Sequence, residues 1–126
     1  MISILLYCLR IAFSVLLLFF IATSSHAETC EGELYLFTQA DVVAAGAGGC
    51  TEINGSLFIG PTFYLSPDAD IHDLSPLSGL TRITGRLEVR RTQLASLNGL
   101  GNLLSIGKRI AIYSNPKLTS LNALSN

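Results

Sequence analysis

The sequence predicts an α/β protein that is mostly β: a right-handed solenoid with a short parallel sheet along one side and one helix at its N-terminal end. Three observations support this fold class. After residue 27, two short apolar motifs each recur three times along the chain. Apolar residues alternate within the first motif, which is typical of a strand with one buried face. Leucines recur every third residue within the second motif, which favours a turn-rich or 3₁₀-like segment.

The first 27 residues form an apolar targeting segment. Residues 11–22 carry no charge and follow Arg10, and Ser25-His26-Ala27 places small residues where signal peptidase prefers them. This uncharged run has the length of a signal-peptide core and is shorter than the ~20 residues of a membrane span. We therefore expect residues 1–27 to be a signal peptide that is cleaved after Ala27. The alternative is an uncleaved anchor, in which residues 2–22 cross the membrane and Arg10 reaches its surface.

The expected export of the chain determines whether its cysteines are interpreted as a disulfide. A cleaved chain is expected to be secreted, periplasmic or held at the cell surface, and an uncleaved chain to be membrane-anchored. Only Cys30 and Cys50 remain after residue 27, and in an oxidising compartment two cysteines permit one intramolecular disulfide. A metal site would need more ligands than these two residues and His72 supply. We expect a Cys30–Cys50 disulfide and no cofactor.

Residues 28–126 form a single small domain. The chain of 126 residues is 49% hydrophobic and 13% charged, and its formal net charge is -1. The 27-residue targeting segment holds the excess of apolar residues, and the remainder has the length of one domain. The charge balance excludes a polycationic nucleic-acid binder. The shortage of histidine and cysteine and the absence of tryptophan argue against most enzymes.

Residues 28–50 are expected to cap the N-terminal end of the solenoid. Residues 34–37 fit a strand, and Thr38 then fits a helix N-cap with Asp41 in the first turn. The glycine-rich residues 46–49 end this helix. A disulfide would hold the short helix against the first repeat, and a solenoid must cover its open end.

The repeated motifs divide residues 51–126 into three turns of the solenoid, here called rungs. The first motif recurs at spacings of 30 and 23 residues and the second at 20 and 24, around the range of leucine-rich repeats. No rung can bury its leucines alone, so the rungs are expected to stack. In order along the chain, the motifs occupy residues 53–59, 74–80, 83–89, 94–100, 106–112 and 118–124.

Two features interrupt the regular repeat. The first rung contains about ten extra residues, 60–72, which we expect to bulge out as a loop. Gly55 and Gly85 occupy one aligned position before the strand, where a left-handed or tight turn would suit glycine. The third rung has Lys108 at that position, so its turn is expected to be of a different type.

Several of these stretches resemble the receptor L-domain family. The similarity is carried by FTQADVVAAGAGGCTEINGSLFIG, DLSPLSGLTRITGRLEV and NPKLTSLNAL, and most of all by the Cys-Thr-x-Ile-x-Gly-x-Leu-x-Ile stretch at residues 50–59. This family comprises leucine-rich-repeat-like solenoid modules found in insulin and epidermal growth factor receptor ectodomains, bacterial exported proteins and some fungal wall proteins. The chain is identified as a short or truncated member of the bacterial exported type. The resemblance implies an extracellular recognition function without catalytic residues.

The outward positions of the three strands form the candidate binding face. Aromatic rings among arginines are typical of binding surfaces. The alternative is a solvated sheet face whose arginines pair with Glu88 or stack on rings. The candidate residues are Phe58, Arg86, Glu88, Arg90, Arg109 and Tyr113.

Other motifs carry weaker functional hypotheses. His72, Asp73 and Ser75 have the residue types of a hydrolase site but lack its nucleophile motif and lie within a structural repeat. Three nearby aspartates could bind calcium, although their spacing fits a solvated loop better. Asn54-Gly55-Ser56 is a possible glycosylation site.

Two functions of different classes follow. The first is an exported, non-catalytic recognition or adhesion module that binds a protein or a glycan through the sheet face. The second is a truncated structural fragment of a longer repeat protein without independent activity. In either case the last rung is expected to lack a cover and to favour self-association. Its apolar residues are Ile110, Ile112, Leu118, Leu121 and Leu124.

Overall fold

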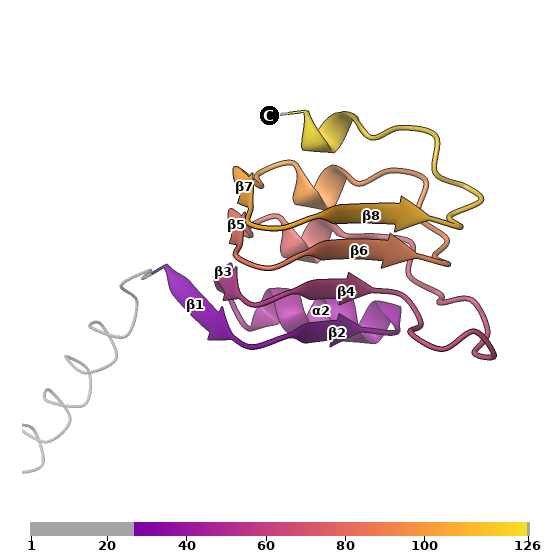
Figure 1. The fold of residues 1–126 in the computed structure, drawn as a ribbon, viewed down its shortest axis with the longest axis horizontal. Coiled ribbons are helices and arrows are strands. Elements are labelled where there is room, and N and C mark those ends of the chain that lie inside the picture. Colours follow the sequence, from indigo (N-terminus) through magenta and orange to yellow (C-terminus); the bar gives the residue numbers. More distant parts are fainter. Residues whose placement is uncertain (1–26, 126) are drawn as a thin grey trace, which may run out of the picture.

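A computed structural model describes residues 27–125 of the chain (Figure 1). The predicted signal peptide therefore lies outside the described residues except for Ala27. In this part of the chain, short strands alternate with one α-helix and three 3₁₀ turns. The elements are β1 (Glu28–Glu31), β2 (Leu34–Leu36), α2 (Gln39–Ala47), β3 (Cys50–Asn54), β4 (Leu57–Ile59), η1 (Ser75–Leu77), β5 (Arg82–Ile83), β6 (Leu87–Arg90), η2 (Asn98–Leu100), β7 (Ser105–Ile106), β8 (Ile110–Tyr113) and η3 (Asn122–Leu124).

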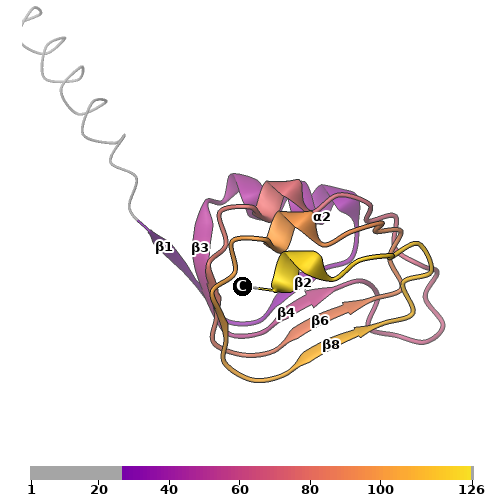
Figure 2. The same cartoon turned by 90° about the horizontal axis from the view of Figure 1, so that it is seen from above.

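The strands form two parallel sheets where the sequence predicted one. Their orders are β1-β3-β5-β7 and β2-β4-β6-β8. Each rung supplies one short strand before its glycine corner and a second strand after it, so the corner separates the sheets. Seen from above, the second sheet faces α2 and the 3₁₀ turns across the core, and the first sheet joins the two layers (Figure 2). The fold is therefore mostly β, with two parallel sheets and one helix among the described residues.

The register confirms the alignment of the strand motifs. Ile53 pairs with Ile83 and Ile83 with Ile106 in the first sheet. In the second sheet Leu57 pairs with Leu87, and Leu87 with Ile110. Equivalent apolar residues thus stack directly on one another, which the two-residue period of a strand requires if one face is to stay buried.

Glycine is required at the corners between the two sheets for a reason other than the predicted left-handed or tight turn. Neither Gly55 nor Gly85 has a positive φ. A Cβ at Gly55 would collide with the backbone of Gly32, and one at Gly85 would collide with the backbone of Gly55. Glycine is needed there because successive rungs approach closely. In the third rung Gly107 takes this role against Thr84, one residue before the aligned Lys108.

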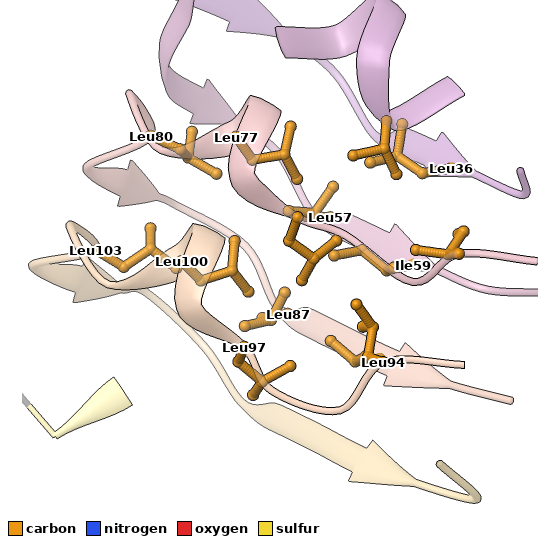
Figure 3. Packing of buried hydrophobic residues seen from close by; sticks show 14 of the residues in the cluster. Leu36, Leu57, Ile59, Leu77, Leu80, Leu87, Leu94, Leu97, Leu100 and Leu103 are labelled. Atoms are coloured by element: carbon orange, nitrogen blue, oxygen red, sulfur yellow. The ribbon is translucent and has the colours of Figure 1, made fainter. Parts of the chain in front are cut away.

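The leucines of the rungs form one continuous core (Figure 3). Leu57, Leu87, Leu97 and Leu100 are completely buried. The predicted Leu-x-x-Leu segments form the 3₁₀ turns η1, η2 and η3. The leucines of η1 and η2 face the sheet (Figure 3). Burial decreases in the last rung, where Leu121 is 53% exposed.

Helix α2 begins as the sequence predicts. The Thr38 hydroxyl accepts a hydrogen bond from the backbone N–H of Asp41, and the Asp41 carboxylate accepts one from the Thr38 N–H. The backbone N–H of Phe37 also donates to Asp41, and these bonds lower the pKa of its carboxyl. The helix packs against η1 at the N-terminal end of the column of 3₁₀ turns, and its Val42 is fully buried.

The extra residues of the first rung form the predicted loop. Residues 61–74 contain neither helix nor strand, and they project beyond the ends of the strands (Figure 1). Ala69 and Ile71 anchor the loop because both are buried in the core. No helix within residues 27–125 is long and apolar enough to cross a lipid bilayer.

The predicted disulfide is present. Cys30 of β1 and Cys50 of β3 are bonded, with their Cα atoms 5.8 Å apart. The bond holds β1 against β3 and closes a segment that contains β2 and α2.

Removing this disulfide is expected to cost about 3 kcal/mol of unfolding free energy, because the bond limits the entropy of the unfolded chain. Urea denaturation of the Cys30→Ser/Cys50→Ser variant measures the loss. Reduction of the wild-type protein should lower its stability to that of the variant, and the variant itself should not respond to reductant. Equal stability of the variant and the oxidised wild type would contradict the prediction.

Candidate binding face

Strands β2, β4, β6 and β8 present one continuous outer surface on the side away from the core (Figure 2). Phe58 lies beside Glu88, and Arg90 lies beside Tyr113, as the alignment predicted. Tyr35 of β2 lies beside Phe58. The residues of this sheet face are Tyr35, Phe58, Arg86, Glu88, Arg90, Arg109, Ala111 and Tyr113.

One half of the sheet face is an aromatic stack. The rings of Tyr35 and Phe58 are stacked with centroids 4.7 Å apart, and the Phe37 ring lies 6.1 Å from Tyr35. The Arg86 guanidinium carbon lies 4.8 Å from the centre of the Phe58 ring. Phe58 is therefore only 6% exposed, which corrects the expectation that its ring faces solvent.

Tyr35 and Phe37 supply the exposed aromatic surface at this end of the face, at 42% and 44% exposure, while the predicted Tyr113 is 44% exposed at the other. Neither residue was among the sequence-predicted candidates. The signal was available, because Leu34 and Leu36 alternate with them and point into the core. The sequence predicts residues 34–37 as a strand of the N-terminal cap, separate from the three strands of the candidate face.

The other half of the sheet face is a closed polar cluster. Arg90 Nη1 lies 2.9 Å from Glu88 Oε1, and the Tyr113 hydroxyl donates to the same oxygen over 3.0 Å. Arg90 Nη1 also donates to the Tyr113 hydroxyl over 2.7 Å. Glu88 is only 6% exposed, so its charge needs these partners. Glu88, Arg90 and Tyr113 stabilise the face and leave little polar capacity for a ligand.

The cations available to a ligand lie at the other end of the strands. A hollow of about 370 Å³ is lined by Glu33, Ser56, Arg86, Lys108 and Arg109. Among the described residues, neither Lys108 nor Arg109 has a carboxylate within ion-pair distance. The single acid of the hollow, Glu33, accepts a hydrogen bond from the Tyr35 hydroxyl over 2.5 Å.

This bond raises the pKa of Tyr35, because an anionic acceptor favours the protonated phenol. The hollow carries three cations against one acid and lies beside the aromatic stack.

The predicted glycosylation site lies outside the sheet face. Asn54 ends β3 in the other sheet and is exposed. Its side-chain amide donates to Glu31 over 2.7 Å and accepts from the Thr84 hydroxyl over 3.1 Å. The asparagine thus joins adjacent rungs.

The hydrolase-like residues do not assemble into a triad. The Ser75 hydroxyl donates to Asp73 over 2.7 Å, and His72 Nδ1 lies 2.8 Å from the backbone oxygen of Asp70. The backbone N–H and the hydroxyl of Ser75 together lower the pKa of Asp73. The hydroxyl faces a carboxylate rather than an imidazole, so the three side chains lack the order of a serine–histidine–acid triad.

The three loop aspartates also bind separate partners. Asp68 pairs with Arg91 over 2.8 Å, Asp70 accepts the Gln39 backbone N–H, and Asp73 binds Ser75. No cluster of three potential metal ligands occurs within residues 27–125. Each carboxylate instead fixes a different part of the loop.

Comparison with known proteins identifies the family. The family model described as Receptor L domain matches residues 49–126. No curated protein and no solved structure matches the chain. The matched region contains every repeated motif and three of the four strands of the candidate face. The chain belongs to the receptor L-domain family, whose members are non-enzymatic ligand-binding modules.

Proposed function

We propose that this protein is an exported recognition module that binds a protein or a glycan through the sheet face. The observation that carries the proposal is the juxtaposition of an exposed aromatic surface with unpaired cations. Tyr35 and Phe37 offer flat apolar area, and Lys108 and Arg109 lie on the same side of the sheet. Tyrosine and arginine are enriched among the residues that dominate binding energy.

The charges of the hollow favour an acidic ligand group. Arg86 is held by its stacking on Phe58, and its backbone N–H donates to the Ser56 hydroxyl. A guanidinium that is already fixed loses little entropy on binding a carboxylate, and its planar fork matches that group. The ligand chemistry that fits is a ring or apolar patch next to a carboxylate, as in an acidic peptide or an acidic sugar.

Export is supported by two features. The N-terminal sequence has the length and charge pattern of a signal peptide. The disulfide between Cys30 and Cys50 suits an oxidising compartment. N-terminal sequencing of the exported protein should return Glu28 as its first residue, whereas a retained Met1 would indicate a membrane anchor.

Binding is expected to fail when the charge of the hollow is reversed. Ligands are first selected by screening the exported protein on an array of acidic and neutral glycans and acidic peptides. Lys108→Glu/Arg109→Glu should then weaken binding roughly thirtyfold, because residues of this kind contribute about 2 kcal/mol. Calorimetry or surface plasmon resonance gives the affinities.

The matched control is Arg82→Glu, which reverses an exposed charge on the other sheet. This variant should bind as the wild type does. Tyr35→Ala should weaken binding without changing the charge. If Arg82→Glu is as harmful as the reversal in the hollow, the sheet face is not the binding site.

A second candidate function is assembly through the last rung. Ile110 and Leu121 are 49% and 53% exposed, whereas their counterparts Leu87 and Leu97 are fully buried. Strand β8 is also an edge of its sheet. Bare apolar rungs and unpaired strand edges favour association. We propose that a second copy of the chain covers this end.

Light scattering across a concentration series tests this assembly. The average mass of the wild type should rise with concentration, and Leu121→Lys should abolish the rise because it places a charge in the contact. Tyr113→Ala changes the sheet face and should have the smaller effect. A constant monomer mass, or a larger effect of Tyr113→Ala, would contradict assembly through the last rung.

A further inference from the structure

The most exposed apolar group of the described residues lies at the tip of the loop between β4 and η1. Phe63, Tyr64 and Leu65 are 75%, 96% and 100% exposed. They are consecutive in the chain and lie at a projecting edge of the molecule (Figure 1; Figure 2). Single exposed apolar residues are common on protein surfaces, but a run of three large ones marks an interaction site.

The loop is held in place by one arginine. The Arg91 side chain donates to the backbone oxygens of Phe63 and Tyr64 over 3.1 and 3.3 Å, and also to the backbone oxygen of Ser66. Its Nε donates to Asp68 over 2.8 Å. The Arg91 backbone oxygen accepts the N–H of Ala69. Because Arg91 binds residues within the tip and on its C-terminal side, the tip keeps one conformation.

These contacts satisfy part of the polar backbone of the tip, which lowers the cost of moving it out of water. Backbone polar groups without partners exclude loops from lipid. Here Arg91 binds the carbonyl groups of Phe63 and Tyr64, and the Ser66 N–H donates to the Phe63 oxygen. Pro61 and Pro67 flank the tip and have no N–H to satisfy.

The tip also carries no charge. Residues 61–67 contain no ionisable group except the Tyr64 phenol, and the nearest ions, Asp68 and Arg91, pair with each other. Phenylalanine, tyrosine and leucine are residues that enter the interface of a bilayer. A convex, uncharged tip fits a deformable apolar surface without a preformed pocket.

We propose that residues 63–65 insert into the interfacial layer of a lipid bilayer, while the sheet face beside the loop stays in water. Membrane contact then does not depend on the N-terminal segment, which the sequence presented as the one membrane-binding part. Insertion is driven by apolar burial and needs no anionic lipid, because the paired ions leave no net charge at the tip.

The absence of tryptophan from the chain makes a direct test possible. Tyr64→Trp places a single reporter at the tip, and Leu104→Trp places one at another exposed site next to β7, on the opposite edge (Figure 1). Each full-length variant is mixed with phosphatidylcholine vesicles whose acyl chains are brominated. Emission from position 64 should shift to the blue and be quenched, and emission from position 104 should not change.

Because both reporters are in the full chain, attachment through the N-terminal segment alone would leave position 64 in water. Solvent-like emission at position 64, or equal quenching at both positions, overturns the proposal. A blue shift without vesicles that grows with protein concentration also overturns it, because the tip would then contact a second copy.

Substitutions on either side of the reporter test the other two residues of the tip. Phe63→Ser and Leu65→Ser should each lower partitioning of the domain onto vesicles roughly tenfold, as expected for the lost burial of one large side chain. Partitioning is read as the loss of quenching at position 64 in the Tyr64→Trp background. Leu104→Ser removes a similar apolar side chain and should have no effect.

Arg91→Lys keeps the charge but loses the fork that binds three carbonyl groups. It should therefore reduce insertion while the domain stays folded, as circular dichroism reports. Insertion that is unchanged by both tip substitutions would contradict the proposal.

Discussion

Gly60→Ala is expected to destabilise the protein by about 2–6 kcal/mol, because a strained backbone costs roughly 1–3 kcal/mol and overpacking costs roughly 1–3 more. Gly60 follows β4 with a φ of +106°, a conformation that residues with a side chain rarely adopt. A Cβ at this position would also overlap the backbone oxygen of Arg90 in the next rung. The backbone cannot yield easily, because the Gly60 N–H donates to the Leu36 oxygen over 2.8 Å.

Gly79→Ala is the matched control. Gly79 has no positive φ, and a Cβ there would meet no atom within 4 Å. Chemical denaturation of the two variants should therefore give a large loss for Gly60→Ala and little change for Gly79→Ala. Equal losses would contradict the assignment of the effect to the strained backbone and the close approach of Arg90, because the lower entropy of the unfolded alanine chain should by itself stabilise both variants.

Leu97→Ala is expected to cost about 2–5 kcal/mol, the usual range for removing most of a buried leucine side chain. Leu97 is fully buried and precedes η2 in the middle of the column of 3₁₀ turns (Figure 3). Rungs above and below hold its neighbours in place, so the cavity cannot collapse. The loss should appear as a lower urea midpoint with an unchanged slope.

Gln93→Ala is the comparison for this prediction. Gln93 is partly exposed and lies in the same rung. Its backbone N–H donates to the Ile71 oxygen over 2.8 Å, a bond that alanine retains. Its loss of stability should be several times smaller than that of Leu97→Ala. Similar losses for the two variants would contradict the assignment of Leu97 to the shared core.

The stacked rungs follow from local sequence patterns. A rung buries its leucines only against another rung, so a repeated Ile-x-Gly-x-Leu-x-Ile segment specifies both the strands and their register. Leu57, Leu87 and Ile110 pair as their alignment requires. The helix start at Thr38 is equally local, because its capping bonds join residues three apart. The disulfide is predicted by the two cysteines after residue 27, which allow only one pairing within that part of the chain.

The exposure of the candidate site residues depends on contacts between rungs more than on local sequence patterns. Alternation identifies which side chains point outward, and it correctly placed Phe58 and Glu88 on the sheet face. It cannot state how much of a side chain its neighbours cover. Phe58 is buried because Tyr35 and Arg86, from the rungs on either side, lie against its ring. The exposed aromatic surface therefore moves to Tyr35 and Phe37.

The repeat, the register, the helix start and the cysteine pair can all be predicted from the sequence, because each depends on residue type and spacing along the chain. The need for the corner glycines and the way in which the long loop is held depend instead on contacts between residues that are distant in sequence. Gly55 and Gly85 have ordinary φ angles and are needed because the backbone of the preceding rung lies against them. Arg91 binds carbonyl groups of residues 25 to 28 positions earlier. Such contacts exist only after the rungs have stacked, so no local pattern contains them.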